Sequence, residues 1–199
     1  EYKLDPVISG CSETSTEIFC TGALTGNTIT TNKTIIISGA TIDGTTGADI
    51  SLSSSIAIII NQSTLNAYGG AGATGNILLR IYNDTDATLK NGTITINGST
   101  LNSYGGAGTT GAGGGGSFLL NGNTLTNVSI YNSTLNNDGG TGGTAGNGVG
   151  QTGGSSSLQI QSRLNKIYIF NSTINSNTGN GGSGTGSGDA GGSAGTHNI

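Results

Sequence analysis

The chain has 199 residues, of which 32% are hydrophobic, 8% are charged and 39 are Gly. Six Lys and Arg against ten Asp and Glu give a net charge of -4, which argues against nucleic acid as a partner, because phosphate backbones are bound by clustered basic side chains. A low content of hydrophobic residues can indicate disorder. Disordered segments usually also carry a high net charge, which this chain does not have, so its composition is compatible with an ordered fold. No apolar segment approaches the ~20 residues of a membrane helix, so we expect no membrane span.

Residues 1–30 precede the repeats described below and are predicted to form an N-terminal cap or docking segment. Cys11 and Cys20 enclose a short loop in this segment. We favour a disulfide over two free thiols or half a metal site, because the Asn- and Thr-rich composition suggests export and no second Cys pair or His cluster completes a zinc site. A chain starting at Glu1 is expected to be a mature polypeptide without its signal segment, although an expressed fragment would look the same. Four apolar residues here belong to no repeat and are predicted to make assembly contacts: Tyr2, Leu4, Val7 and Ile8.

A short phrase then recurs five times within residues 31–175: an apolar residue, any residue, Ile, three variable residues, Thr, an aliphatic residue, and Asn or Asp. The phrase occupies residues 35–43, 58–66, 94–102, 128–136 and 167–175. Its Thr stands at 41, 64, 100, 134 and 173, so the spacings are 23, 36, 34 and 39 residues. A constant phrase with a variable spacer predicts a repeat protein whose spacers are loops.

Alternating apolar residues at the start of each phrase predict a strand with one buried face. The next aliphatic residue lies five positions after the Ile, so the chain must bend between two short strands. A Gly-rich stretch and a second apolar run follow, as in residues 77–81, 118–120 and 158–160. Each repeat is therefore predicted to hold about three strands and one long loop. Two inward ladders are expected, one from Ile37, Ile60, Ile96, Ile130 and Ile169, the other from Ile42, Leu65, Leu101, Leu135 and Ile174.

This repeat resembles the coils of right-handed parallel β-helices of the pectin-lyase-like kind, over roughly residues 31–175. The resemblance implies an all-β fold of about five coils, with Gly-rich loops projecting from one corner. The spacing of 23 residues fits a bare coil, and the longer spacings fit a coil with an insertion. The composition also resembles that of secreted, Asn/Thr/Gly-rich surface and filament proteins of archaea and bacteria.

Eight Asn residues stand in N-x-S/T sequons, which are acceptors for N-linked glycans in exported proteins. They are Asn32, Asn61, Asn83, Asn91, Asn97, Asn127, Asn132 and Asn171. Asn61, Asn97, Asn132 and Asn171 fall at the corner after the buried Ile, where a side chain points to solvent. The alternative is an asparagine ladder, in which corner amides bond the backbone of their own turn. Apart from N-linked glycans, we expect no cofactor.

The Gly-rich stretches contain two GxGxxG matches, at residues 70–75 and 106–111. A dinucleotide site needs a helix directly after such a loop, whereas apolar strands follow here, so we expect no nucleotide. Runs this rich in Gly could instead pack side by side as extended, polyproline-II-like segments, with floppy linkers as the alternative. Tyr68 and Tyr104 start two of these stretches and are expected to stack. Residues 176–199 are predicted to be a Gly-rich C-terminal tail.

We expect no catalysis and no metal site. Enzymes with the fold that the chain resembles use clustered Asp residues with Arg, Lys or His. Here Asp84 and Asp86 make the one close acidic pair and lie in a predicted turn, and His197, the single His, lies in the tail. Solvated turn carboxylates are the simpler interpretation of that pair.

The favoured function is that of a structural subunit of an extracellular, N-glycosylated filament or surface fibre. The last repeat is expected to lack the later strands of its coil, which leaves an open end for the N-terminal segment of the next copy. A cell-surface or phage-type adhesin that binds surface carbohydrate is the alternative, although an adhesin should show more exposed aromatic residues. An ice-binding solenoid is a third possibility, because the repeated Thr forms one rank, but the sequons beside it would obstruct a flat surface.

Overall fold

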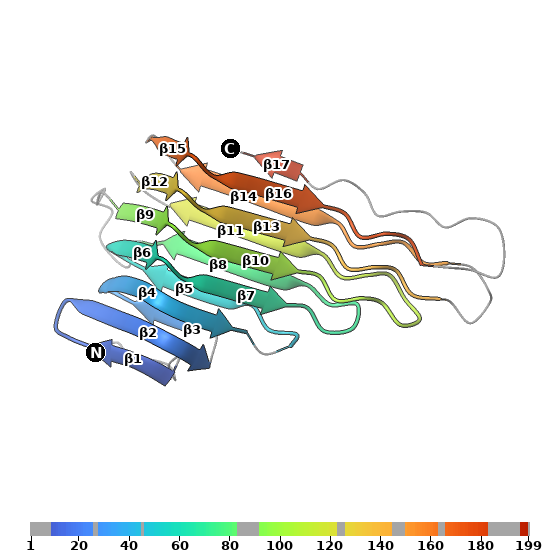
Figure 1. Ribbon diagram of the computed structural model, residues 1–199, viewed down its shortest axis with the longest axis horizontal. Coiled ribbons are helices and arrows are strands. Elements are labelled where there is room, and N and C mark those ends of the chain that lie inside the picture. Colours follow the sequence, from blue (N-terminus) through green and yellow to red (C-terminus); the bar gives the residue numbers. More distant parts are fainter. Residues whose placement is uncertain are drawn as a thin grey trace.

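The computed structural model describes residues 9–25, 28–44, 46–82, 92–122, 126–144, 150–162, 166–182 and 196–198. All regular elements in these ranges are β-strands, and they form two curled sheets (Figure 1). The strands before the third phrase are β1 (Ser9–Glu13), β2 (Glu17–Thr25), β3 (Thr28–Thr31), β4 (Thr34–Asp43), β5 (Ile50–Ser54), β6 (Ala57–Asn61), β7 (Thr64–Tyr68) and β8 (Gly75–Ile81). The later strands are β9 (Gly92–Asn97), β10 (Thr100–Tyr104), β11 (Gly116–Gly122), β12 (Thr126–Tyr131), β13 (Thr134–Asp138), β14 (Ser156–Ser162), β15 (Ile167–Phe170), β16 (Thr173–Asn177) and β17 (Thr196–Asn198).

Successive repeats place equivalent strands side by side and parallel. The large sheet has the order β15-β12-β9-β6-β4-β7-β10-β13-β16, with β2 beside β4 and β1 beside β2, and the small sheet has the order β17-β14-β11-β8-β5-β3. The chain thus runs along the large sheet, returns along the small sheet and begins the next repeat. This alternation is that of a β-solenoid, here called the column, and it confirms the all-β prediction with parallel strands.

The register of the strands confirms the repeat. The five Thr residues of the phrase are consecutive partners, and so are the five Ile residues that precede the bend. Eight of the ten predicted ladder residues are fully buried, with 0% of their surface exposed. The two in the last repeat differ, since Ile169 is 37% exposed and Ile174 is half-buried. Strands β15 and β16 are edge strands of the large sheet, so no further described strand of this sheet covers these side chains.

The small sheet supplies a third inward ladder opposite the first two. Its partners are Ile29, Leu52, Leu79, Leu120 and Ile160, all buried. Burying each such side chain contributes about 1.5–3 kcal/mol, so the column is held together mainly by stacked aliphatic residues.

The predicted bend between the two strands of each phrase has a defined backbone conformation. In every repeat the residue two positions after the buried Ile has positive φ: Gly39, Gln62, Gly98, Asn132 and Asn171. Gly and Asn accept this left-handed conformation most readily, which explains their frequency at this corner. In the first repeat the bend interrupts no strand, because β4 continues through it.

The N-terminal end of the large sheet carries an antiparallel hairpin. Strand β1 pairs with β2, and Cys11 lies opposite Cys20, to which it is disulfide-bonded as predicted. The Lys33 ammonium forms an ion pair with Glu13 at 2.6 Å and donates to the carbonyl of Thr14, which ties the hairpin to the start of β4. The residues predicted for assembly, Tyr2, Leu4, Val7 and Ile8, lie outside the described residues.

The prediction that the last repeat lacks its later strands is wrong for the small sheet. Residues 196–198 form β17, which pairs in parallel with β14 and places His197 beside Leu158. The segment expected to be a tail therefore returns to the column and extends the small sheet by one short strand. Sequence reasoning missed β17 because it is only three residues long and contains no apolar side chain.

Candidate functional site

The Gly-rich connections between the two sheets form a second, distinct layer of structure that projects from one side of the column (Figure 1). We call them the glycine arms: their described residues are 69–74, 105–115, 139–144, 150–155 and 178–182. Each complete arm has an outgoing half, which leaves the large sheet, and a returning half, which enters the small sheet. The arms lie one above the other in the order of the repeats.

Backbone hydrogen bonds with a period of three residues join the outgoing halves. The amide of Gly69 donates to the carbonyl of Tyr104, the last residue of β10, at 2.7 Å, and the amide of Gly72 donates to the carbonyl of Ala107 in the next arm at 3.1 Å. The same pair of bonds recurs from Gly105 and Gly108 to Asp138 and Thr141, and from Gly139 and Gly142 to Asn177 and Asn180. Three residues per turn is the period of the polyproline II helix, in which N–H and C=O groups point sideways and can bond neighbouring chains.

A second set of bonds joins outgoing to returning halves in a continuous zigzag. The amide of Gly106 donates to Ala73, Gly114 to Gly106, Gly140 to Gly114, Gly154 to Gly140 and Gly179 to Gly154, each at 2.8–3.0 Å. A Cβ atom at any of these five Gly positions would lie less than 3.0 Å from the backbone of a neighbouring arm. Only residues without a side chain allow such close approach, so the Gly content is a packing requirement.

The arms are therefore side-by-side extended segments, as the first of the two sequence interpretations predicted. Both GxGxxG matches, at residues 70–75 and 106–111, lie in this layer and lead into strands β8 and β11. Neither match has a helix behind it to present amides to a pyrophosphate.

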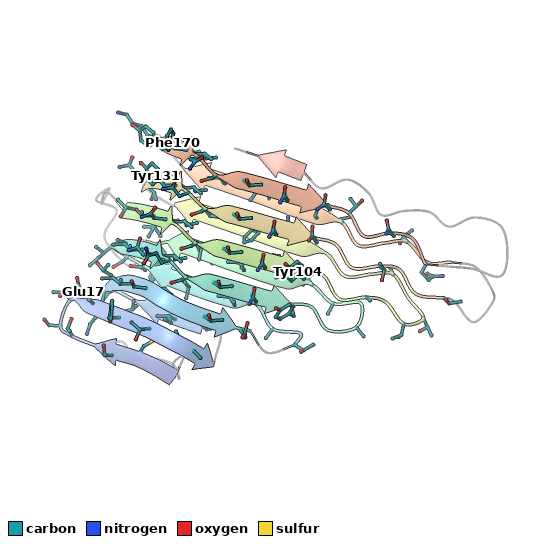
Figure 2. All side chains as sticks on the ribbon, in the orientation of Figure 1. Glu17, Tyr104, Tyr131 and Phe170 are labelled. Atoms are coloured by element: carbon teal, nitrogen blue, oxygen red, sulfur yellow. A yellow bond between two sulfur atoms is a disulfide. The ribbon has the colours of Figure 1, made fainter. Side chains whose placement is uncertain are left out.

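Two stacked tyrosines mark the base of the arms, where β7 and β10 end. Tyr68 and Tyr104 are register partners, and their ring centroids are 5.6 Å apart with an interplanar angle of 20°. Asp138 is the partner of Tyr104 on its other side. Burial, together with the charges of Asp138 and Tyr68, raises the pKa of the Tyr104 phenol above its usual value. Figure 2 shows Tyr104 at this junction of column and arms.

The four corner sequons occupy two neighbouring positions of the bend. Asn61 and Asn97 are register partners on the outward face, and Tyr131 and Phe170 continue the same rank. Asn132 and Asn171 stand one position later, at the residue with positive φ, and the Asn171 amide donates to the Asn132 side-chain oxygen at 2.8 Å. Asn97, Asn132 and Asn171 are exposed, and Asn61 is half-buried.

The remaining sequons are spread over the column. Asn32 is exposed between β3 and β4, whereas Asn127 is half-buried on β12 and accepts a bond from the Lys166 amide at 3.5 Å. Asn83 and Asn91 lie outside the described residues.

A serine ladder lies directly behind the corner. Ser63, Ser99 and Ser133 are 2–3% exposed, and Ser172 continues the ladder in the last repeat. Each hydroxyl donates to the carbonyl two residues earlier and accepts the amide of its counterpart in the preceding repeat. Ser63 and Ser99 are also the third residues of the sequons at Asn61 and Asn97.

An amide ladder at the end of the phrase escaped the sequence interpretation. The side chains of Asn66, Asn102, Asn136 and Asn175 each donate to the preceding one, and Asn66 donates to Asp43, at 2.7–2.8 Å. A chain of amides that all donate in one direction ends in a group that only accepts, and a carboxylate suits this position. The signal was present, because the last residue of the phrase is Asn four times and Asp in the first repeat.

A shallow hollow lies on the outer face of the small sheet. It has a volume of roughly 430 Å³ and is lined by Thr30, Ser51, Ser53, Arg80 and Tyr82. The Tyr82 hydroxyl donates to the Thr31 carbonyl at 3.2 Å, and burial raises the pKa of its phenol. Arg80 is exposed and has no ion-pair partner among the described residues.

The predicted acidic pair, Asp84 and Asp86, lies outside the described residues, and His197 lies in β17. Within the described ranges no three His, Cys, Asp or Glu side chains gather into a group that could hold a metal ion. The same part of the chain has no helix long and apolar enough to cross a membrane. Compared with known proteins, the chain matches no family model, no curated protein and no solved structure.

Proposed function

We propose that this chain is the structural subunit of an extracellular, N-glycosylated filament that grows head-to-tail. The observation that carries this proposal is the edge of the large sheet at β15, which has no further partner strand among the described residues. Ile169, the inward ladder residue of edge strand β15, is 37% exposed, whereas Ile37, Ile60, Ile96 and Ile130 are at 0%. An apolar ladder beside an unpaired strand edge favours strand addition from another chain.

The partner in this proposal is a second copy of the chain. The two ends of one column differ, so contacts between unlike ends of successive copies do not close into a ring and generate a filament. The N-terminal segment, with Tyr2, Leu4, Val7 and Ile8, supplies apolar residues for the open end. Because β1 pairs with the edge of β2 within the same chain, we assign the contact with the neighbouring copy to the residues before Ser9. We further propose that the column is a right-handed parallel β-helix of about five coils with pectin-lyase-like architecture.

Deleting residues 1–8 tests the joint, because the truncated chain keeps β1 and the disulfide. We expect a folded column that no longer polymerises, as seen by electron microscopy and circular dichroism. The matched control replaces Glu17, an exposed residue on β2, by Gln and should polymerise normally. Unchanged fibres after the deletion would refute the joint, and a cryo-EM map of the fibre would decide handedness and coil number.

Extracellular location and glycosylation belong to the same proposal. The disulfide fits an oxidising compartment. Because the Ser63 and Ser99 hydroxyls are buried behind Asn61 and Asn97, sugars at these two sites would be attached before the corner closes. A native mass equal to the 19.5 kDa of the bare chain would exclude glycosylation.

The hollow on the small sheet favours a second candidate, an adhesin that binds carbohydrate. Three hydroxyls, one guanidinium and one aromatic ring suit an acidic sugar, whose carboxylate would pair with Arg80. Titration of oligogalacturonate into the wild-type chain and into Arg80→Gln tests this function. Binding to the wild-type chain that is lost in Arg80→Gln would support the adhesin function. Absence of binding to the wild-type chain at millimolar ligand would exclude it.

A further inference from the structure

The stacked arrangement of Tyr68 and Tyr104 suits a reaction between their two phenol rings, in addition to its contribution to packing. The two residues end β7 and β10 in the same register, so their rings are stacked in parallel, 5.6 Å between centroids. Tyr68 is 38% exposed, which leaves it open to a soluble oxidant. Among the described residues this is the one pair of aromatic rings in contact, and Tyr82, Tyr131 and Tyr168 lack such a partner.

A proton acceptor stands next to the pair. Removing one electron from a phenol makes it strongly acidic, so oxidation requires a nearby base or water. Asp138 follows Tyr104 in the register of β10 and β13, and its charge acts on the Tyr104 phenol. The exposed Tyr68 can release its proton to solvent.

We propose that Tyr68 and Tyr104 form an oxidative cross-linking site, in which a carbon–carbon bond joins the two rings at positions ortho to the hydroxyls. A peroxidase with hydrogen peroxide is the class of oxidant. Each phenol loses one electron and one proton to become a phenoxyl radical, and the radicals couple at Cε. The hydrogens on the coupled carbons then move to the oxygens and restore two phenols. Hydrogen peroxide takes up the two electrons and two protons and becomes two waters.

The bond would close a loop of 36 residues between Tyr68 and Tyr104 and join two neighbouring repeats where the arms begin. A covalent link of this kind restricts the unfolded chain more than the folded one, so it raises the temperature of unfolding. The position suits a fibre, because it fixes the column against separation of its repeats. The reaction itself requires neither assembly nor glycosylation.

The test uses the full-length, unglycosylated chain treated with a haem peroxidase and hydrogen peroxide. We expect a monomer that has lost two hydrogens, shows dityrosine fluorescence and, after trypsin, yields residues 34–80 joined to residues 91–163. Tyr68→Phe and Tyr104→Phe should each lose this product and keep the fold, since Phe preserves the ring. Tyr131→Phe is the matched control, because Tyr131 lies in the same tryptic peptide as Tyr104, and it should give the product unchanged.

Three results would overturn the proposal: a link that persists in Tyr68→Phe, a link that disappears in Tyr131→Phe, or intermolecular dimers with no internally linked monomer. Treatment of the wild-type chain in urea provides a second measurement that needs no variant. If the stacked geometry directs the reaction, unfolding should reduce the yield of this pair relative to other tyrosine pairs. Equal yields from folded and unfolded chain would contradict the proposal.

Discussion

The column and the glycine arms keep the same repeat register by different physical means. In the column, inward Ile and Leu side chains stack on one another, and the backbone bonds of the sheets follow. In the arms, most of the described Gly residues place backbone against backbone, and hydrogen bonds between arms replace side-chain burial. The column therefore tolerates changes in its outward side chains, whereas the arms cannot accept even a methyl group at the five Gly positions of their zigzag.

The largest expected effect is a charge in the column. Ile96 is fully buried in the ladder, so Ile96→Asp places an unpaired carboxylate among aliphatic residues and should prevent folding. Thr95→Asp is the matched control, since Thr95 points outward on the same strand and is half-buried. Circular dichroism should show an unfolded Ile96→Asp chain and a folded Thr95→Asp chain. A cooperative thermal transition in Ile96→Asp would contradict the ladder.

A smaller but selective effect is expected in the arms. A Cβ at Gly106 would overlap the Gly70 carbonyl, so Gly106→Ala should push two arms apart and cost about 1–3 kcal/mol. Gly111 is the control, because a Cβ there meets nothing within 4 Å and its backbone needs no positive φ. Gly111→Ala should be neutral or stabilise the chain by about 0.4–1 kcal/mol.

Hydrogen exchange measures the effect of Gly106→Ala on the arms and on the column separately. In Gly106→Ala the amides of Gly106, Gly114 and Gly140 should exchange faster, while those of the column strands keep their protection. Equal protection of the arm amides in the wild type and Gly106→Ala would show that the arms do not depend on close backbone contact.

The amide ladder is intermediate between the column and the arms, because it consists of side chains, as the column ladders do, but is stabilised by hydrogen bonds, as the arms are. Asn102 is 9% exposed, donates to Asn66 and accepts from Asn136, so Asn102→Ala leaves the half-buried side chains of Asn66 and Asn136 each without one hydrogen-bond partner. We expect a loss of about 1–3 kcal/mol in the free energy of unfolding. Asn175→Ala removes one bond at an exposed end and should cost less than half as much. Equal losses in urea denaturation would indicate that the ladder contributes nothing beyond local packing.

The column could be predicted from the sequence because buried aliphatic residues stabilise it, and these residues recur at fixed positions in the phrase. Ile37, Ile60 and Ile96 repeat at the same place in the phrase, and a buried ladder leaves few alternatives. The pairing of the arms was harder to predict in detail, since every Gly looks the same in sequence while only some approach a neighbouring backbone. The last strands were least predictable: β17 has no apolar side chain, and Ile169 fits the phrase yet is exposed because β15 is an edge strand among the described residues.

The smallest predicted effect concerns the junction of the two regions and has the opposite sign. Asn137 lies at the end of β13, is 1% exposed, and its side-chain amide has no hydrogen-bond partner among the described residues. Its register partners in neighbouring repeats are Ser103 and Ser176, which are smaller. Burying an amide without a partner costs about 1–3 kcal/mol, so Asn137→Ser should raise the free energy of unfolding by about 1 kcal/mol.

Thermal or urea denaturation measures this change, and Asn136→Ser is the matched control. Asn136 is the adjacent ladder residue, bonded to Asn102 and Asn175, so its replacement should destabilise the chain. The opposite signs at two neighbouring asparagines separate the contribution of the residue type from that of its surroundings. If both variants lose stability, Asn137 is satisfied by bound water, and the junction is held by polar contacts as the ladder is.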